Sequence, residues 1–570
     1  MALRARFTPP LPAGPLVDPQ VDLVSPVTPR PLHALLDDAA ARFPANPCLD
    51  FLGYRYRYRD VARLVTRAAR GLQAIGVFPG TRVGLMLPNT PYFVVLYFAV
   101  LKAGGVVVCF NPLLAEREIE QQIADSGVEI MATLDLGALF GKLARVLERQ
   151  PIRHLVVCRM SCILPTPKRQ LFRMLRRREV ANVPTDERHV WFERLIVNNG
   201  RVDTPVCEPE RTVAMLQYTG GTTGTPKGAE LTHANLYVNA IQVGRWFHGC
   251  KPGQERVLGV LPLFHIFGMA TVMNVGLLLG AELVLLPRFE IEQLMQTIHR
   301  KRPTIFPAVP TLFAAIGRYE ECSRYDLSSI EICVSGGAPL PAEVKESFER
   351  LTGCVIVEGY GLTEASPVVC INPVGGARKT GSIGLPLPLT ELDIVSLEDG
   401  RTPVPQGERG ELCVRGPQVM RGYLGKPAET AEALAGGHLH TGDVAYRDAD
   451  GYLFIVDRIK DIILSGGFNV YPRNVEEAIY LHPAVEECVV AGVPDAYRGQ
   501  AVKAWIKLAP GKQLSRDELR AFLEDKLSHI EMPRLVEFRD QPLPKTMIGK
   551  LSRKELLAEE TAAATTGAAA

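Results

Sequence analysis

The 570-residue sequence lacks any apolar run long enough to cross a bilayer, and it has almost no excess of either charge. Its longest apolar stretches, Tyr92–Leu101 and Gly268–Ala281, are shorter than the ~18–20 residues that a membrane-spanning helix needs. Lys and Arg number 64 against 62 Asp and Glu, which gives a formal net charge of +2. The short apolar runs predict no membrane span. With so small a net charge the protein has no overall electrostatic attraction for nucleic acid, so we expect no nucleic-acid partner.

Cysteine is also scarce, with 12 residues and no C-x-x-C pair; Cys158 and Cys162 stand closest together. From this density and spacing we expect neither a disulfide framework nor a zinc site. Residues 1–15 lack the apolar centre of a secretory signal and are interrupted by prolines. We therefore expect reduced thiols and a cytoplasmic location.

The composition is that of a globular protein, and apolar strand-like runs alternate with helical patterns. The length corresponds to roughly three or four folding units at about 150 residues each. The alternation of strand and helix predicts βαβ units and largely parallel sheets. The predicted strands include 83–87, 106–110, 130–134, 256–261, 282–286, 305–307 and 330–334, and the predicted helices include 91–103 and 115–125.

The character of the sequence changes after about residue 385, where short strands alternate with turns. After residue 457 a compact α+β segment follows, with strands near 459–464, 488–492, 501–507 and 534–538, and helices over 472–482 and 515–527. Ser515 and Glu518 form the sequence pattern of a capping box at the start of the second helix. The predicted domains are an extended arm (1–30), a large domain (31–459), a small domain (460–557) and a disordered tail (558–570).

The most informative segment is Tyr218–Gly228, YTGGTTGTPKG, which lies between a strand-like run and a helix-like run. Its glycines allow a tight turn that presents backbone N–H groups, and its threonines add hydroxyl donors, so the loop suits a polyphosphate. It is not the Walker loop, because Pro226 precedes Lys227 and Gly228 follows it. Taken alone, it is also compatible with a glycine-rich surface turn.

Seven further motifs follow this segment in one order. They are LPLFHIF (261–267), SGGAP (335–339), EGYGLTE (358–364), HTGD (440–443), DRIKD (457–461), SGGFNVYP (465–472) and LPKTMIGK (543–550). Together they resemble the adenylate-forming acyl-CoA synthetases, most closely the bacterial long-chain fatty acid–CoA ligases, from about residue 32 to 557. The resemblance implies an α/β fold in which a large domain, made of two α/β subdomains and a small β-barrel, precedes a mobile α+β domain. It also implies a two-step reaction: a carboxylate attacks ATP to give acyl-AMP and pyrophosphate, and the thiol of coenzyme A then displaces AMP.

The resemblance also assigns residues to the first step. Lys550 and His265 would act on the reacting carboxylate and α-phosphate, and Glu364 would hold Mg²⁺ together with Thr219. Asp443 and Arg458 would contact the ribose. The remaining ATP-binding assignments are Gly220, Gly221, Thr222, Thr223, Gly224 and Lys227 for the phosphates, and Gly336, Gly337, Gly359, Tyr360, Gly361 and Thr363 for the rest of the nucleotide, with Tyr360 on the adenine.

For the second step, the resemblance makes Lys460 a hinge between the large and small domains. Rotation about it would replace Lys550 with the segment Ser465, Gly466, Gly467 and Phe468, which would contact coenzyme A. His265 is equally compatible with a buried structural role.

Two segments bear on the substrate and on partners. Residues 266–276 are uncharged and rich in Gly, Ala and Met, which suits either an alkyl tunnel or plain core packing. Residues 168–178 contain six basic side chains and an apolar helical face, which suits either an anionic lipid surface or a solvated loop. Medium-chain, long-chain, dicarboxylic and aryl acids remain open as substrates, as do carrier-protein loading, non-enzymatic acyl or nucleotide binding, and a homodimer.

Overall fold

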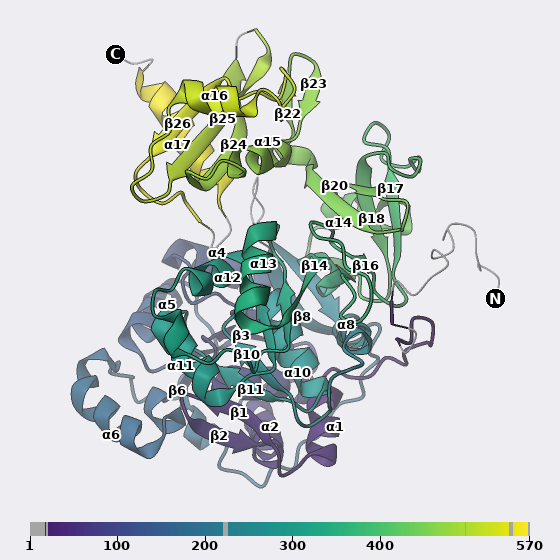
Figure 1. The fold of residues 1–570 in the computed structure, drawn as a ribbon. Helices are drawn as coiled ribbons and strands as arrows, with labels where there is room; N and C mark the ends of the chain where they lie inside the picture. The colour runs from purple at the N-terminus through teal and green to yellow at the C-terminus, as the bar shows by residue number, and fades with distance from the viewer. Residues whose placement is uncertain (1–16, 19–20, 220–225, 496, 546–550, 568–570) are drawn as a thin grey trace, which may run out of the picture. The chain divides into compact units, whose positions relative to one another are not determined.

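The computed structural model describes residues 17–18, 21–219, 226–495, 497–545 and 551–567. It consists of two compact units (Figure 1). Unit 1 comprises residues 1–391 and 414–439, and unit 2 comprises 392–413 and 440–570. No helix in the described ranges is both long and apolar enough to cross a membrane.

The first sheet of unit 1 is parallel in its centre, as the βαβ pattern predicts, with antiparallel strands at both edges. Helices α11 (Ile291–Lys301), α12 (Pro310–Gly317) and α13 (Ala342–Thr352) bury their apolar faces against one side of it. Within the described residues its strand order is β16 (Leu385–Pro386), β15 (Val368–Ile371), β14 (Val355–Gly361), β13 (Ile332–Ser335), β12 (Ile305–Ala308), β10 (Arg256–Gly259), β11 (Glu282–Leu285), β1 (Pro47–Phe51) and β2 (Tyr54–Arg57).

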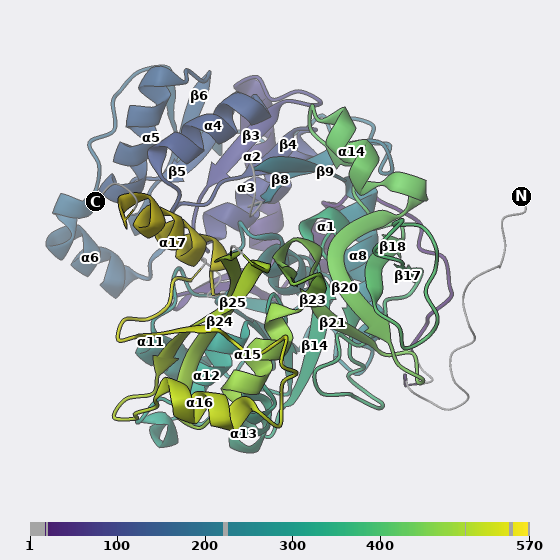
Figure 2. The ribbon, with the colours of Figure 1, turned by 90° about the horizontal axis from the view of Figure 1, so that it is seen from above.

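The second sheet of unit 1 is also parallel in its centre, but only one of its two edges is antiparallel. Helices α4 (Glu116–Ser126) and α5 (Gly137–Arg149) lie side by side on one face (Figure 2), and their apolar residues join the core. In the part of the chain that the structure describes, its strand order is β19 (Gly422–Tyr423), β9 (Lys227–Thr232), β8 (Val213–Thr219), β4 (Val106–Cys109), β3 (Arg82–Met86), β5 (Ile130–Leu134), β6 (His154–Cys158) and β7 (His189–Trp191). Two α/β subdomains are therefore present, as predicted.

The helices of unit 1 follow the βαβ rhythm. Pro91 occupies the first turn of α3, where its missing N–H costs no helical hydrogen bond. The helices are α1 (Ala34–Arg42), α2 (Tyr58–Ala74), α3 (Pro91–Lys102), α4 (Glu116–Ser126), α5 (Gly137–Arg149), α6 (Thr166–Leu175), α7 (Phe192–Leu195), α8 (His233–Trp246), α9 (Ile266–Gly268), the π-helical turn η3 (Met269–Asn274), α10 (Val275–Leu278), α11 (Ile291–Lys301), α12 (Pro310–Gly317), α13 (Ala342–Thr352) and α14 (Pro427–Ala433).

Unit 2 contains the α+β domain that the sequence predicts. Its sheet runs β23 (Phe468–Val470), β22 (Ile463–Ser465), β25 (Gly499–Leu508), β24 (Val485–Asp495), and β26 (Leu535–Arg539) pairs with β25. Helices α15 (Pro472–Tyr480) and α16 (Arg516–Leu523) cover one face, and α17 (Arg553–Gly567) packs on the other. The capping box at Ser515 and Glu518 is confirmed, because the Ser515 hydroxyl accepts the Glu518 N–H.

The β-rich segment after residue 385 forms a separate sheet in the order β17 (Glu391–Val395), β18 (Gly410–Arg415), β20 (Leu439–Arg447) and β21 (Leu453–Arg458). Among the described residues these strands do not close into a barrel, and the small barrel that the resemblance implies stays a prediction. Its strands β20 and β21 belong to unit 2, so the compact units do not divide at residue 459.

Two further expectations are corrected. The strand predicted over 459–464 begins only at Ile463, because Ile459–Asp461 form a 3₁₀ turn. The tail predicted to be disordered from residue 558 continues α17 to Gly567, since Glu559 and Glu560 pair with Arg539 and Lys503. The described part of the N-terminal arm has no helix or strand, as expected, and it is attached to unit 1 through Asp18 and His248, 3.1 Å apart.

Candidate active site

The glycine- and threonine-rich segment connects two paired strands of unit 1. Thr219 at the end of β8 is the register partner of Lys227 at the start of β9. The segment therefore begins and ends at directly paired positions on two neighbouring strands. Gly220, Gly221, Thr222, Thr223 and Gly224 lie outside the described residues.

Lys227 and Glu364 are connected through a tyrosine that the sequence did not single out. The Tyr423 hydroxyl donates to Glu364 Oε1 at 2.8 Å, and Lys227 Nζ lies 5.0 Å from the centre of the Tyr423 ring. Burial and the Glu364 charge raise the pKa of Tyr423, so the hydroxyl keeps its proton and remains the donor. Tyr423 is 59 residues from Glu364 in the chain, and only the pairing of β19 with β9 brings it to this place.

Three of the predicted glycines have neighbours within the protein itself. A Cβ at Gly361 would lie 2.1 Å from the Pro367 carbonyl oxygen, and one at Gly336 would lie 3.0 Å from the Phe267 ring. A Cβ at Gly359 would lie 3.1 Å from Ile371. Packing inside unit 1 therefore accounts for glycine at these positions. Gly337 has a φ of +79°, which itself favours glycine.

His265 caps the short helix α9. Its Nδ1 accepts the Phe267 N–H at 3.3 Å, which leaves the ring proton on Nε2. Desolvation lowers the pKa of His265 to about 4, so the ring is neutral at pH 7. The structural role is thus observed, and the neutral Nε2–H remains a hydrogen-bond donor.

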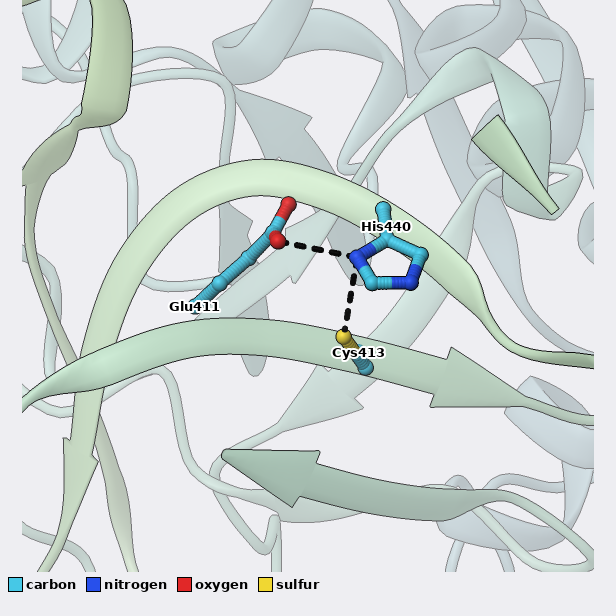
Figure 3. A group of neighbouring side chains, drawn as sticks. All are labelled: Glu411, Cys413 and His440. Atoms are coloured by element: carbon cyan, nitrogen blue, oxygen red, sulfur yellow. Dashed lines mark hydrogen bonds and ion pairs between the residues drawn. The ribbon is translucent and has the colours of Figure 1, made fainter. Parts of the chain in front are cut away.

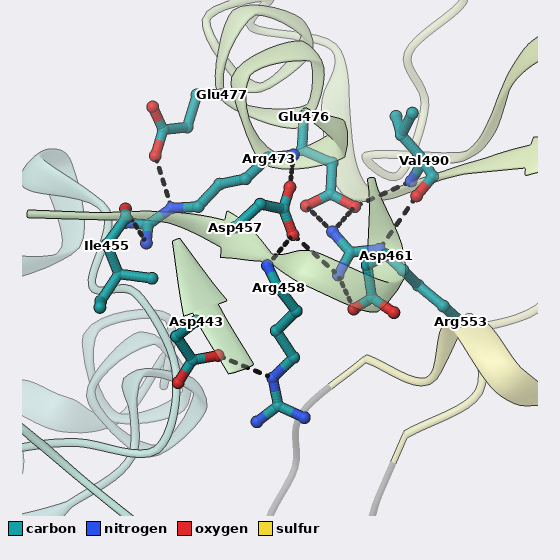
Figure 4. A network of polar contacts seen from close by, with 10 residues as sticks. All are labelled: Asp443, Ile455, Asp457, Arg458, Asp461, Arg473, Glu476, Glu477, Val490 and Arg553. Atoms are coloured by element: carbon teal, nitrogen blue, oxygen red, sulfur yellow. Dashed lines mark hydrogen bonds and ion pairs between the residues drawn. The ribbon is translucent and has the colours of Figure 1, made fainter. Parts of the chain in front are cut away.

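Asp443 and Arg458, which the sequence analysis placed in the large domain (31–459), lie together in unit 2. They are opposite each other on β20 and β21, and Arg458 Nε is 3.3 Å from Asp443 Oδ1 (Figure 4). The Asp443 side chain is mostly buried, whereas that of Arg458 is about two-fifths exposed. This arrangement presents a carboxylate and a guanidinium at one edge of the sheet.

Hydrogen bonds and ion pairs connect residues just before and just after Lys460 to later parts of unit 2. Asp457 accepts the Arg473 N–H at 2.7 Å, and Arg473 donates to the Ile455 carbonyl (Figure 4). Arg553 pairs with Glu476 at 2.7 Å and with Asp461 at 3.2 Å. Neighbouring carboxylates raise the pKa of Arg553 despite its burial, so the guanidinium stays charged. This network fixes the flanks of the predicted hinge to α15 and α17.

Ser465 and Phe468 are paired at the ends of a tight hairpin between β22 and β23. Gly466 and Gly467 have φ of +59° and +85°, and no atom lies within 4 Å of a Cβ added to either, so backbone conformation is what requires glycine here. Ser465 is buried, whereas the Phe468 side chain is 58% exposed. Lys550, the remaining residue predicted for catalysis, lies outside the described residues.

The apolar segment 266–276 is buried and contains the π-helical turn η3. Thr271 and Val275 from this segment line a small internal cavity together with Phe247, Val257, Ile305, Pro307 and Val334. The cavity volume is about 10 Å³, which holds no more than one water molecule. In this conformation, core packing fills most of the space around the segment.

Residues 168–178 include the predicted amphipathic helix. None of the α6 residues is buried, and Leu171, Met174 and Leu175 are 55, 78 and 69% exposed. Lys168 and Arg169 donate to backbone carbonyls of Leu52 and Cys162, which attach the helix to unit 1. In both overall views α6 lies at the periphery of this unit (Figure 1, Figure 2).

Comparison with known proteins places the chain in the family of AMP-binding enzymes. The AMP-binding enzyme family matches residues 36–424, and the AMP-binding enzyme C-terminal domain matches residues 474–550. The chain belongs to this family.

Individual relatives are similar over nearly the whole length. A long-chain-fatty-acid–CoA ligase of Bacillus subtilis (strain 168) is 44% identical over 543 residues, which cover 94% of this chain and 96% of the relative. A feruloyl-CoA synthase of an Amycolatopsis species is 37% identical over 88% of this chain and 94% of its own. The crystal structure of an anthranilate CoA ligase with anthranoyl-AMP superposes with a TM-score of 0.83 at 27% identity, covering 95% and 99% of the two chains.

Proposed function

We propose that this enzyme activates a medium- or long-chain fatty acid with ATP and coenzyme A, through an acyl-adenylate, and releases AMP and pyrophosphate. The observation that carries the proposal is the connection of Lys227, at the end of the glycine–threonine segment, to Glu364 of the EGYGLTE motif through Tyr423. The similarity to a long-chain-fatty-acid–CoA ligase over 94% of the chain supports the class of acid.

In the first step, two anions must meet, so the site has to supply positive charge and oriented donors. Lys227 and the segment from Thr219 to Gly224 would hold the β- and γ-phosphates. The neutral His265 would direct its Nε2–H toward a carboxylate or phosphate oxygen. Lys550 would neutralise the charge that develops between the carboxylate and the α-phosphate.

The residues also suit a hard cation. Glu364 offers a carboxylate with one oxygen bound by Tyr423, and Thr219 offers a hydroxyl; oxygen ligands are those that Mg²⁺ prefers. Bound there, Mg²⁺ would offset the negative charge of the phosphates. The Tyr423 hydroxyl would orient the Glu364 carboxylate for this task.

In unit 2, Asp443 would accept hydrogen bonds from the ribose hydroxyls, with Arg458 beside it. For the second step, the hairpin of Ser465, Gly466, Gly467 and Phe468 would let pantetheine pass close to the backbone. The exposed Phe468 ring supports a contact with an incoming group. Lys460 would be the hinge that exchanges this hairpin for Lys550 between the two steps.

The apolar segment 266–276 would line the path of the alkyl chain. The cavity beside Thr271 and Val275 is too small for an alkyl chain, so buried side chains of the segment, which include Met269 and Met273, would have to move to admit one. Methionine suits this task because its unbranched side chain adapts to irregular spaces. Each methylene buried would contribute about 0.8 kcal/mol.

We further propose that α6 rests on an anionic membrane surface, where fatty acids partition. The exposed apolar side chains Leu171, Met174 and Leu175 share one helical face, and Arg173, Arg177 and Arg178 lie within or directly after the helix. Liposome sedimentation tests this contact. Changing these three arginines to Ser is expected to reduce binding to phosphatidylglycerol vesicles, and unchanged binding would refute the contact.

An aryl acid is the second candidate substrate, because a feruloyl-CoA synthase is 37% identical to this chain. The deciding experiment measures AMP release over a panel of fatty, dicarboxylic and aryl acids, with and without coenzyme A. We expect the highest kcat/KM for a medium- or long-chain fatty acid, with acyl-CoA as product. A preference for an aryl acid would overturn the fatty-acid assignment and make aryl acids the substrates of the enzyme. A thioester formed only on an added carrier protein, or no AMP release with any acid, would refute it.

A further inference from the structure

Three side chains of different chemistry converge in the β18–β20 region of unit 2. His440 Nδ1 lies 2.8 Å from Glu411 Oε2 and 3.5 Å from Cys413 Sγ (Figure 3). One imidazole nitrogen, one sulfur and one carboxylate oxygen all lie within 4.8 Å of one another. Glu411 and Cys413 are two residues apart on β18, so their side chains point to the same face of the strand.

This arrangement does not suit a Cys–His–Glu nucleophilic triad. In a triad the base receives the nucleophile's proton on one ring nitrogen while the acid orients the other nitrogen. Here the thiol and the carboxylate both face Nδ1 (Figure 3). Cys413 is also buried, and burial together with Glu411 and Asp393 raises the pKa of its thiol to about 12, so an ordinary thiolate does not form at neutral pH.

Hydrogen bonding alone also leaves the group incompletely satisfied. If Nδ1 carries the ring proton, it donates to Glu411, and the Cys413 thiol then has no acceptor on that nitrogen. If Nδ1 is unprotonated, it accepts from the thiol but faces the Glu411 oxygen lone pair to lone pair. One cation at the point where the three atoms converge would accept lone pairs from all of them.

We propose that Glu411, Cys413 and His440 bind a thiophilic divalent cation, with Zn²⁺ as the best match. The combination of thiolate, imidazole and carboxylate is one that Zn²⁺ accepts and that Mg²⁺ does not prefer. Binding displaces the thiol proton to solvent and leaves His440 as the Nε2–H tautomer, so the neutral imidazole coordinates through Nδ1. The negative charge of Glu411, which disfavours a bare thiolate, favours the cation.

The surroundings allow the ion to enter without disrupting the sheet. The His440 and Glu411 side chains are 20% and 12% exposed, which gives a route from solvent to the buried sulfur. Glu411 Oε1 separately accepts the Gly442 N–H at 2.9 Å, and this bond remains when Oε2 coordinates. None of these three residues is among those proposed to hold Mg²⁺, which are Thr219 and Glu364 of unit 1.

Cobalt substitution tests the proposal on the full-length protein. Chelator-treated protein is titrated with Co²⁺, which reports a thiolate ligand through sulfur-to-metal charge-transfer absorption. We expect this absorption to saturate at one equivalent of Co²⁺ per chain. Zn²⁺ should displace the Co²⁺ and abolish the absorption, whereas excess Mg²⁺ should not. Zn²⁺ should also raise the midpoint temperature of unfolding. Cys413→Ser should abolish the absorption. Cys207→Ser is the matched control at a partly buried cysteine of unit 1 and should retain it.

A second pair of variants covers the case in which Cys413→Ser fails to fold. Glu411→Gln and His440→Gln keep the thiol and should weaken Co²⁺ affinity at least tenfold. The proposal is overturned if no charge-transfer absorption develops, if it persists undiminished in folded Cys413→Ser, or if it is lost in Cys207→Ser instead. Unchanged affinity in both Glu411→Gln and His440→Gln would equally overturn it.

Discussion

Removing the Tyr423 hydroxyl tests the connection between Lys227 and Glu364. Tyr423→Phe deletes the 2.8 Å hydrogen bond to the Glu364 carboxylate but keeps the ring under Lys227. A hydrogen bond to a charged group contributes about 1.5–3 kcal/mol, and because Glu364 is only partly buried we take the lower end. We therefore expect about a tenfold loss in adenylation at subsaturating Mg·ATP.

Tyr423→Leu also removes the contact between the Lys227 ammonium and the ring. A cation–π contact contributes about 0.5–1 kcal/mol, so we expect a further loss of about two- to fivefold. The assay is fatty-acid-dependent pyrophosphate release without coenzyme A, over a Mg²⁺ titration. Tyr92→Phe is the control, because it removes a partly buried hydroxyl bond to the Arg159 carbonyl elsewhere in unit 1. If both Tyr423 variants match this control, Tyr423 does not position Glu364.

Three other outcomes are expected. Asp443→Asn should raise the KM for ATP about 10- to 100-fold, because the amide loses the charge that strengthens the proposed ribose hydrogen bonds; an unchanged KM would contradict that role. Phe468→Ser should slow acyl-CoA formation while pyrophosphate release without coenzyme A stays within twofold, and equal loss in both steps would argue against a thioester-step role. His233 is buried, its Nδ1 accepts the Leu32 N–H at 3.0 Å, and burial lowers its pKa from 6.5 to about 4. The unfolded state therefore binds the proton first, so the free energy of unfolding should fall by about 3 kcal/mol as the pH drops from 6.5 to 4, and urea titrations of His233→Gln should show a smaller fall.

Much of the fold could be predicted from the sequence, because local patterns determine it. The βαβ alternation, the helix predicted over 91–103 and the Ser515 capping box all appear in the structure. The strand predicted at 459–464 was wrong at its start, since the local apolar pattern does not reveal the 3₁₀ turn at Ile459–Asp461. The tail predicted to be disordered is helical, and its ion pairs to Arg539 and Lys503 depend on tertiary structure.

The candidate site shows the same division between local and long-range information. Asp443 and Arg458 were predicted together, and strand pairing places them 3.3 Å apart. Tyr423 could not be found from spacing, because β19 reaches Glu364 only through its pairing with β9. The reason for glycine at position 361 is likewise long-range, since only the fold shows the Pro367 carbonyl beside it.

The most direct test of the central claim is exchange of labelled pyrophosphate into ATP in the absence of coenzyme A. A two-step ligase forms acyl-AMP reversibly, so exchange should require the fatty acid and Mg²⁺ but not the thiol. Lys550→Ala should lose this exchange by about 10²–10³-fold, as expected for removal of one preorganised charge. Exchange without any acid, no exchange with any acid, or full exchange in Lys550→Ala would contradict the account.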